Sequence, residues 1–557
     1  MTKLQKQLLA GILLLAAVLI FFRLTRHDPL GDDAHYSFRA IGYFDYLGSK
    51  EQTTPVQWFG HRPAWSYLSF HDHPPLVFLI QHIFFSIFGV SLFVSRLPSA
   101  LAALGSVLVI FFIAKRLAGP KAGLAAALAL AVNNYFIWTG RIALLESVFI
   151  FFLLLSFLYL LKTFEDSKYF IHTGLFFGLS LLSKYTVLFI LPAVLLFLVW
   201  KHRWIFKNKR FWQGMMVFLV LCLPVVIYNL MMFKTRGHFD VQFADLFGQV
   251  HNDWPKLAMR ISKPDPNFLG VLTTIADGFS WPYFAAFILS IFFSLHLARR
   301  AAAVYLFVFA AVSLFFFFAF AGGAVRWMGV LAPFAALLVG LAAAAFAERK
   351  KYLAAAVAIP FAVFSIFYTW NTNHLKRPVA GPNWYAGFRL ENYGYNQLDK
   401  EISKLLTGKK PTPKIKYATT QWWYRDLDEK AIEFPIINQG AGVFGSAIIV
   451  DSEHIWFPMY WAKEKWKFYH RFSIKTSNEF LQVVDAKGGL EIINFVQFDK
   501  IYYFKSGPRI RETADLKYEG SDPLFEAILK KGILPKIIYD DQGNEAFYMY
   551  ETSELAI

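Results

Sequence analysis

The sequence predicts a polytopic α-helical membrane protein of about eleven spans, followed by a C-terminal extracytoplasmic α+β domain. Its 557 residues are 56% hydrophobic and only 17% charged, whereas an ordinary soluble protein has about 25% charged residues. The 61 phenylalanines, 26 tyrosines and 16 tryptophans suit lipid-facing and interfacial surfaces. Long apolar runs recur up to residue 370, beyond which the chain becomes polar. This composition excludes a disordered chain and argues against a purely soluble enzyme.

The net charge and the cysteine count limit which partners and cross-links the chain can have. The chain carries 56 basic and 39 acidic side chains, a formal net charge of +17. In a membrane protein this excess reflects basic cytoplasmic loops and contact with anionic membrane lipid, so we expect no nucleic-acid partner. The single cysteine, Cys222, lies in an apolar run, which rules out a disulfide framework or a cysteine-based metal site within the chain.

The spans follow from length, because a membrane helix needs about 20 mostly apolar residues. We expect spans at residues 7–23, 96–114, 122–139, 142–161, 169–183, 185–200, 211–233, 281–297, 301–320, 328–347 and 352–369. The first span follows Lys3 and Lys6, and no small-residue cleavage site comes after it. We therefore expect a retained anchor rather than a signal peptide.

The basic loops predict the orientation. With the N-terminus in the cytoplasm, the strong basic clusters all fall on the cytoplasmic side; they lie at 115–121, 162–168, 201–210, 299–300 and 349–351. An odd number of spans then places the C-terminus outside. If the apolar stretch 74–90 also crossed, every later loop would invert, so we expect it to lie in the outer interface.

The predicted domains follow from these spans. Residues 1–370 form the membrane domain, in which 24–95 are a first external loop with juxtamembrane helices, and 234–280 form a second external loop. Residues 371–557 form a C-terminal domain outside the membrane. A strand-like stretch at 491–504 and a helical pattern at 398–406 favour an α+β fold there.

Costly charges gather at the predicted outer ends of the spans. Charge at the membrane is expensive, and its presence there predicts function. The residues concerned are Asp32, Asp33, Asp72, His73, Arg141, Glu146, Lys184 and Arg326. Carboxylates can deprotonate an acceptor or hold a divalent metal. Arginine and lysine can bind a phosphate and stabilise charge that develops on it as it leaves. The set therefore suits transfer of a group from a phospholipid carrier at the outer leaflet.

Three motifs carry a family resemblance. Asp-Asp-Ala-His-Tyr at 32–36 resembles the Asp-Glu-Ala-x-Tyr-type motif in the first external loop of GT-C glycosyltransferases. Asp-His-Pro-Pro-Leu at 72–76, followed by Arg-Leu-Pro-Ser-Ala at 96–100, is similar to the bacterial branch. That branch holds protein-mannosyltransferase-like enzymes and aminoarabinose (lipid A) transferases. Leu-Ser-Lys-Tyr-Thr at 182–186 also matches, and the resemblance covers roughly residues 25–200.

The resemblance implies transfer of a sugar from a polyprenyl phosphate sugar, usually with inversion. It makes Asp32 the general-base candidate, with Asp33 beside it, and places Glu146 at the second acidic position. Asp33 stands where Glu is commoner, and Glu146 stands where Asp is commoner. The division of labour between base and acceptor-orienting roles therefore stays open.

The remaining roles concern the donor and a metal. Lys184, Arg326 and Arg141 are expected to bind the donor phosphate, and His73 and Tyr36 to contact substrate. Asp72 falls where aminoarabinose transferases have a metal-binding carboxylate, and His73 falls where they have Lys. A divalent metal at Asp72 is the one cofactor that the resemblance raises.

Structural roles compete with these. Asp32 and Asp33 could cap a helix, Glu146 could pair with Arg141, and Lys184 could extend to the interface as an anchor. His238 and His251, in the second external loop, could ligate a metal with Asp72.

We therefore expect an inverting glycosyltransferase that moves a sugar from a polyprenyl phosphate sugar to a lipid A, glycan or protein acceptor on the outer face of the membrane. The alternative is a polytopic transporter of a lipid-linked or anionic substrate, but the costly charges cluster at one edge and no inverted repeat is visible. We expect a multi-pass protein of the bacterial inner membrane, with a cytoplasmic N-terminus and a periplasmic C-terminal domain.

Overall fold

The computed structural model describes residues 1–46, 53–59, 63–253, 268–297, 303–320, 329–377, 379, 391–410, 442–443, 446–470, 472, 474–485, 500–514 and 522–553. The chain divides into two compact units whose segments alternate along the sequence. The first unit comprises Met1–Leu24, Leu47–Thr54 and Arg62–Leu390, and the second comprises Thr25–Tyr46, Pro55–His61 and Glu391–Ile557. The predicted domain boundary at residue 370 stays a prediction.

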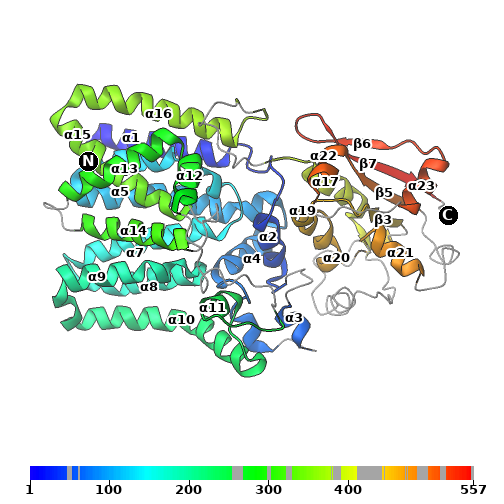
Figure 1. Cartoon of the computed structure of the whole chain (residues 1–557), viewed down its shortest axis with the longest axis horizontal. Coiled ribbons are helices and arrows are strands. Elements are labelled where there is room, and N and C mark those ends of the chain that lie inside the picture. The colour runs from blue at the N-terminus through cyan, green and yellow to red at the C-terminus, as the bar shows by residue number, and fades with distance from the viewer. Residues whose placement is uncertain are drawn as a thin grey trace. The chain divides into compact units, whose positions relative to one another are not determined.

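The first unit is helical (Figure 1). Its helices are α1 (Lys3–Phe21), α4 (Leu76–Phe88), α5 (Leu92–Ala131), α6 (Asn134–Gly140), α7 (Leu145–Thr163), α8 (Phe170–Ser183), α9 (Leu191–Lys201), α10 (Lys209–Arg236), α11 (Val241–Leu246), α12 (Phe268–Phe279), α13 (Trp281–Leu297), α14 (Val304–Phe320), α15 (Ala332–Arg349) and α16 (Lys351–Asn373). A 3₁₀ turn, η3 (Tyr185–Phe189), precedes α9. Helix α5 packs against α1, α7 and α15, and α8 packs against α7 and α10.

Six of the described helices are long and apolar enough to cross a bilayer: α1, α5, α7, α10, α15 (with residues 329–331) and α16. Helices α12 and α13 form a seventh candidate, bent by 116°. The protein is therefore a multi-pass membrane protein. The predicted spans at 96–114 and 122–139 lie on α5 and α6, and α5 is interrupted by non-helical backbone at Ala118 and Gly119. Pro120, which lacks a backbone N–H, follows this break.

Most of the apolar stretch at 74–90 forms helix α4. Its 13 residues rise about 20 Å, which is too short for the hydrocarbon core of about 30 Å. Its length therefore agrees with the expectation that this stretch does not cross.

Close backbone contacts fix how α8 packs on α10. A Cβ added to Gly174 on α8 would lie 1.9 Å from the carbonyl oxygen of Gly214 on α10. A Cβ added to Gly214 would lie 2.2 Å from the carbonyl oxygen of Phe170. Only glycine allows these two backbones to approach so closely.

The second unit contains a five-stranded mixed sheet in the order β4-β3-β5-β7-β6. Its strands are β3 (Ser446–Val450), β4 (Ile474–Thr476), β5 (Lys500–Ser506), β6 (Lys536–Tyr539) and β7 (Glu545–Thr552), and a separate parallel pair is β1 (Lys409–Lys410) with β2 (Gly442–Val443). Strands β4, β3 and β5 are parallel, with Ile448 opposite both Ile474 and Tyr502, whereas β7 is antiparallel to β5 and β6.

The second unit also contains helices, and the first of them carries Asp32 and Asp33. They are α2 (Asp32–Gly42), α3 (Pro55–Trp58), α17 (Tyr395–Leu406), α19 (Trp456–Met459), the π-helical turn η7 (Tyr460–Glu464), α20 (Lys465–Tyr469), α21 (Ser477–Asp485), α22 (Pro508–Thr513) and α23 (Pro523–Lys530). The expected α+β fold and the helix near 398–406 are confirmed. The expected strand at 491–504 is described from residue 500 only, as β5, because 491–499 lie outside the described residues.

Helix α2 packs on α19, η7 and α20 of the C-terminal part of the chain. The Phe38 ring lies 5.4 Å from the Tyr460 ring and 5.3 Å from the Tyr469 ring, measured between centroids. The Tyr469 hydroxyl donates to the Phe38 carbonyl at 2.7 Å. The helix that carries Asp32 and Asp33 is thus part of the second unit.

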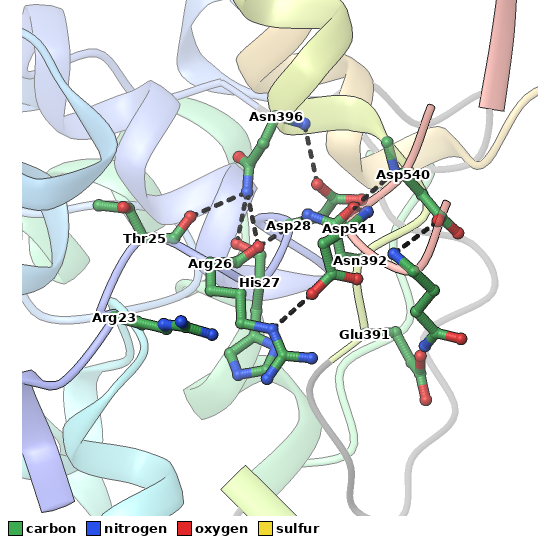
Figure 2. A network of polar contacts seen from close by, with 12 residues as sticks. Arg23, Thr25, Arg26, His27, Asp28, Glu391, Asn392, Asn396, Asp540 and Asp541 are labelled. Atoms are coloured by element: carbon green, nitrogen blue, oxygen red, sulfur yellow. Dashed lines mark hydrogen bonds and ion pairs between the residues drawn. The ribbon is translucent and has the colours of Figure 1, made fainter. Parts of the chain in front are cut away.

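The chain before α2 is bound into the same unit (Figure 2). The Asp28 carboxylate accepts the backbone N–H groups of Tyr393, Tyr395 and Asn396 at 2.6, 3.2 and 2.8 Å. The Asn396 side-chain amide donates to the carbonyls of residues 25–27, and Arg26 forms a 2.5 Å ion pair with Asp541. Two distant stretches of sequence therefore build the second unit together.

Candidate active site

A buried ion pair joins two of the predicted site residues in the first unit. Glu146 lies in the first turn of α7 and is 2% exposed. Lys184 lies at the break between α8 and η3, and its Nζ pairs with Glu146 Oε1. Their sequence separation of 38 is bridged because α7 and α8 are packed neighbours. The sequence analysis offered a structural ion pair between Glu146 and Arg141 as an alternative to a site role. In the structure the partner of Glu146 is Lys184 instead.

Asp240 extends this cluster, and the sequence analysis missed it. Its Oδ2 accepts the Tyr185 hydroxyl and the Asn229 side-chain amide, both at 3.0 Å. Its Oδ1 accepts the Phe243 backbone N–H at 2.9 Å, which makes it the N-cap of α11. Tyr185 is the residue after Lys184, so the two buried carboxylates are linked through neighbouring residues. An Asp before a short apolar helix was the available signal, but it also fits a plain helix cap.

Burial governs the protonation of Asp240. Removal from water raises the pKa of the Asp240 carboxyl to about 6, and the negative charge of Asp72 contributes to the rise. The hydrogen bonds from Phe243, Asn229 and Tyr185 oppose it. A carboxyl with such a pKa can hold or release a proton near neutral pH.

Asp72 lies between two imidazoles. His71 Nδ1 is 3.9 Å from one of its carboxylate oxygens, and His73 Nε2 is 3.9 Å from the other. The Val241 N–H donates to the His71 carbonyl at 2.7 Å, which ties this loop to the start of α11. Imidazole nitrogen and carboxylate oxygen are ligands that Zn²⁺ accepts, so the donor set fits the predicted metal. The metal role of Asp72 and the substrate role of His73 stay predictions.

Asp32, Asp33 and Tyr36 lie on α2 in the second unit. The N-cap of α2 is Gly31, at φ 56°, and it makes no side-chain capping bond. Asp32 and Asp33 instead occupy the first helical turn, where the helix dipole favours negative charge. Asp33 and Tyr36 are buried, and Asp32 is partly exposed. Neither aspartate is the N-cap, although the competing interpretation was a capping role.

Arg141, a predicted phosphate ligand, is fully buried at the end of α1. Its guanidinium donates to the carbonyls of Leu19, Ile20, Phe22 and Arg23 at 2.8 to 3.2 Å. Positive charge stabilises a helix C-terminus because the last carbonyls lack intrahelical partners. Through these contacts Arg141 holds the end of α1 in place. Its predicted role as a phosphate ligand stays a prediction. Arg326 lies outside the described residues.

The predicted residues thus fall into three groups. Glu146 and Lys184 are in direct contact, and Asp72 acts electrostatically on Asp240, all in the first unit. Asp32, Asp33 and Tyr36 share one helix of the second unit. Arg141 contacts the carbonyls that end α1.

Comparison with known proteins covers the same region. Residues 72–228 match the family described as dolichyl-phosphate-mannose-protein mannosyltransferase. The chain is 33% identical over 144 residues to YycA of Bacillus subtilis strain 168, which is named provisionally as a mannosyltransferase. That alignment covers 25% of this chain and 21% of YycA, so it spans about a fifth of the relative's length.

Two solved structures match almost the whole chain. ArnT from Cupriavidus metallidurans, solved with bound undecaprenyl phosphate, superposes with a TM-score of 0.55 at 14% identity, over 99% of this chain and 98% of ArnT. The Archaeoglobus fulgidus oligosaccharyltransferase, solved with Zn and sulfate, gives a TM-score of 0.50 at 15% identity, over 97% of this chain and 72% of that protein.

The fold is therefore the GT-C fold, and the predicted resemblance is confirmed. The whole chain thus shares this fold, and residues 72–228 in addition match the mannosyltransferase family model.

Proposed function

We propose that this protein is an inverting glycosyltransferase that moves a sugar from a polyprenyl phosphate sugar to a lipid, glycan or protein acceptor. The observation that carries the proposal is the buried Glu146–Lys184 pair, with Asp240 hydrogen-bonded to the next residue, Tyr185. This cluster draws most of its residues from the segment that matches the mannosyltransferase family. The undecaprenyl phosphate bound to ArnT supports a polyprenyl carrier for the donor.

The proposed reaction is a single displacement. The Asp32 carboxylate takes the proton of the acceptor hydroxyl or amine, with Asp33 beside it and Tyr36 contacting substrate. The acceptor atom then attacks the anomeric carbon from the face opposite the phosphate. The bond from that carbon to the phosphate oxygen breaks, and polyprenyl phosphate leaves with the electron pair. Lys184 and Arg326 stabilise the charge that develops on it.

Glu146 has a positioning role in this scheme. The Glu146 carboxylate restricts the rotamers of the Lys184 side chain through the ion pair, so the amine is held in place for a phosphate. Arg141 keeps its place at the end of α1. A divalent metal held at Asp72, with His73 nearby, would supply Lewis-acid stabilisation of the phosphate.

The proposed setting is a bacterial inner membrane. We propose eleven crossings, a cytoplasmic N-terminus and a periplasmic C-terminal domain, because the basic loops then share the cytoplasmic side. The acidic and basic site residues, at the opposite ends of their spans, then belong to the outer face.

The test compares envelope lipids, glycans and proteins by mass spectrometry. A deletion strain should lack one sugar mass, which plasmid-borne wild type restores. Asp32→Asn should leave that mass absent although the protein still inserts. A matched carboxylate variant at the far end of α7, Asp166→Asn, should restore it.

Full restoration by Asp32→Asn would refute the assignment of the base. Flux of a lipid-linked or anionic substrate across proteoliposome membranes, with no sugar transferred, would favour the transporter over the glycosyltransferase.

A further inference from the structure

Two imidazoles and a carboxylate converge in the second external loop of the first unit. His238 Nε2 lies 2.7 Å from Asp253 Oδ2, and His251 Nδ1 lies 3.3 Å from the same oxygen. The two imidazole rings are 4.5 Å apart between centroids. His238 and Asp253 are buried, whereas the His251 side chain is 33% exposed. The sequence analysis paired these histidines with Asp72, and the structure gives them Asp253 instead.

A neutral His238 ring cannot donate to both of the oxygens that it faces. Its Nδ1 lies 2.7 Å from the Phe239 carbonyl oxygen, and its Nε2 faces the carboxylate. Both of these oxygens only accept hydrogen bonds, so a neutral imidazole with one N–H can satisfy only one of them. Either the ring carries two protons, or a cation lies between Nε2 and Oδ2. Donation from the second nitrogen to a backbone carbonyl is the usual arrangement of a metal-binding histidine.

His251 presents a lone pair beside the same carboxylate. Its Nδ1 accepts the Asp253 backbone N–H at 3.2 Å, and a metal ion bound at this nitrogen would replace that hydrogen bond. A histidine binds a metal through such a lone pair, and an aspartate binds it as a carboxylate.

The carboxylate has room for both a cation and its arginine partner. Arg236 donates to Oδ1 at 2.7 Å and to Oδ2 at 3.0 Å. A carboxylate offers about four acceptor positions, so Oδ1 can keep Arg236 while Oδ2 faces the histidines. Ligand atoms around a tetrahedral Zn²⁺ are roughly 3.3 Å apart. The His251 separation already matches this value, and His238 needs to move by about half an ångström.

The backbone holds the three side chains in place. The Thr53 N–H donates to the Asp253 carbonyl at 2.7 Å, and the Thr53 hydroxyl donates to Asp253 Oδ1 at 3.2 Å. The Phe239 N–H donates to the Gln249 side chain at 3.0 Å, which joins the two limbs of the loop. Groups fixed in this way lose little entropy on binding an ion.

We propose that His238, His251 and Asp253 bind a divalent transition-metal ion of the zinc class, with water as the fourth ligand. The site is distinct from the predicted metal at Asp72 and does not depend on the proposed reaction. The partly exposed His251 gives the ion a route from solvent. The ion would fasten residues 237–253 into one loop, because its ligands come from both ends of that segment.

The test measures metal content directly. The full-length protein in detergent is stripped with chelator, reloaded with Zn²⁺ or Co²⁺ and washed, and the bound metal is counted by mass spectrometry. Wild type should retain an ion at this site, and His251→Ala should weaken its affinity by roughly tenfold or more. His172→Ala, which changes a histidine on α8, should bind as wild type. The Co²⁺ form should show visible absorption that His251→Ala abolishes.

Two results would overturn the site. One is a wild-type protein that retains no metal, which leaves His238 as an imidazolium in an ion pair with Asp253. The other is metal that is lost in Asp72→Asn but kept in His251→Ala and in Asp253→Asn. Because His251 is partly exposed, its alanine variant should fold, and thermal unfolding of each variant checks this.

Discussion

At the scale of single residues, the Glu146–Lys184 pair carries the strongest energetic consequence. Loss of one partner leaves a buried charge uncompensated, which costs about 3–5 kcal/mol. We predict that Lys184→Met lowers the free energy of unfolding by this order and abolishes sugar transfer. The double variant Glu146→Gln with Lys184→Met should regain much of the stability but none of the activity. Thermal unfolding in detergent and envelope mass spectrometry measure the two effects.

Equal stability of the single and double variants would show that the pair is not coupled. Activity of the double variant would remove Lys184 from the proposed reaction.

Asp240 gives a pH-dependent prediction. Its folded-state pKa of about 6 exceeds the ordinary value of 3.8. Between about pH 4 and pH 6 the folded protein therefore keeps a proton that the unfolded chain releases, and the contribution of Asp240 to stability falls as pH rises. Asp240→Asn removes this slope. We expect the Tm of the variant, relative to wild type, to rise from pH 4 to pH 6 and then to level off.

Parallel Tm curves for wild type and Asp240→Asn over that range would contradict the raised pKa.

The residue types at the site could be predicted from sequence, but their partners could not. Glu146, Lys184 and Asp72 stand out because charge is rare among apolar runs. Glu146 has a nearby cation in Arg141, which makes that pairing the simplest one along the sequence. In the structure Arg141 contacts the end of α1, more than a hundred residues away in sequence, and the cation that pairs with Glu146 is Lys184. Such contacts depend on which helices pack together.

At the scale of the element, α1 depends on Arg141. Four carbonyls at the end of α1 share its guanidinium, and a hydrogen bond to a charged group is worth about 1.5–3 kcal/mol. We predict that Arg141→Gln lowers the Tm of the protein while the KM for the lipid-linked donor stays unchanged. Arg141→Lys should recover part of the loss, because a lysine keeps the charge but not the planar fork.

If Arg141→Gln raised the KM for the donor and left the Tm unchanged, Arg141 would be a ligand of the donor phosphate rather than an anchor of α1.

Element type was predictable where length and periodicity agree. The apolar length of α7 or α10 identifies a span without further information. The break in α5 at Ala118 and Gly119, and the 116° bend between α12 and α13, depend on local backbone conformation that hydropathy does not register. The two short helices α4 and α11 border the site, and their place follows from loop contacts such as the one between Val241 and His71.

At the scale of the whole molecule, the second unit is assembled from both ends of the chain. The Asp28 carboxylate accepts hydrogen bonds from the backbone N–H groups of Tyr393, Tyr395 and Asn396. Each N–H left without an acceptor would lower the free energy of unfolding by about 1–3 kcal/mol. We predict that Asp28→Ala loosens residues 25–31 and increases limited proteolysis there. It should also reduce sugar transfer, because α2 with Asp32 follows directly. Asp166→Ala serves as the control.

Unchanged protease protection in Asp28→Ala would show that the network in Figure 2 does not hold this segment. The network was not predictable, because its partners are more than 360 residues apart in sequence.

The central claim is that the acidic and basic groups of the proposed reaction act on one side of the membrane. Since the chain has a single cysteine, a Cys222→Ser background allows Asp32→Cys and Lys184→Cys to be probed one at a time with a membrane-impermeant maleimide on intact spheroplasts. Labelling after denaturation provides the total. We expect both positions to react from the outside without permeabilisation. Labelling of Asp32→Cys from outside and of Lys184→Cys only after permeabilisation would contradict the proposed reaction.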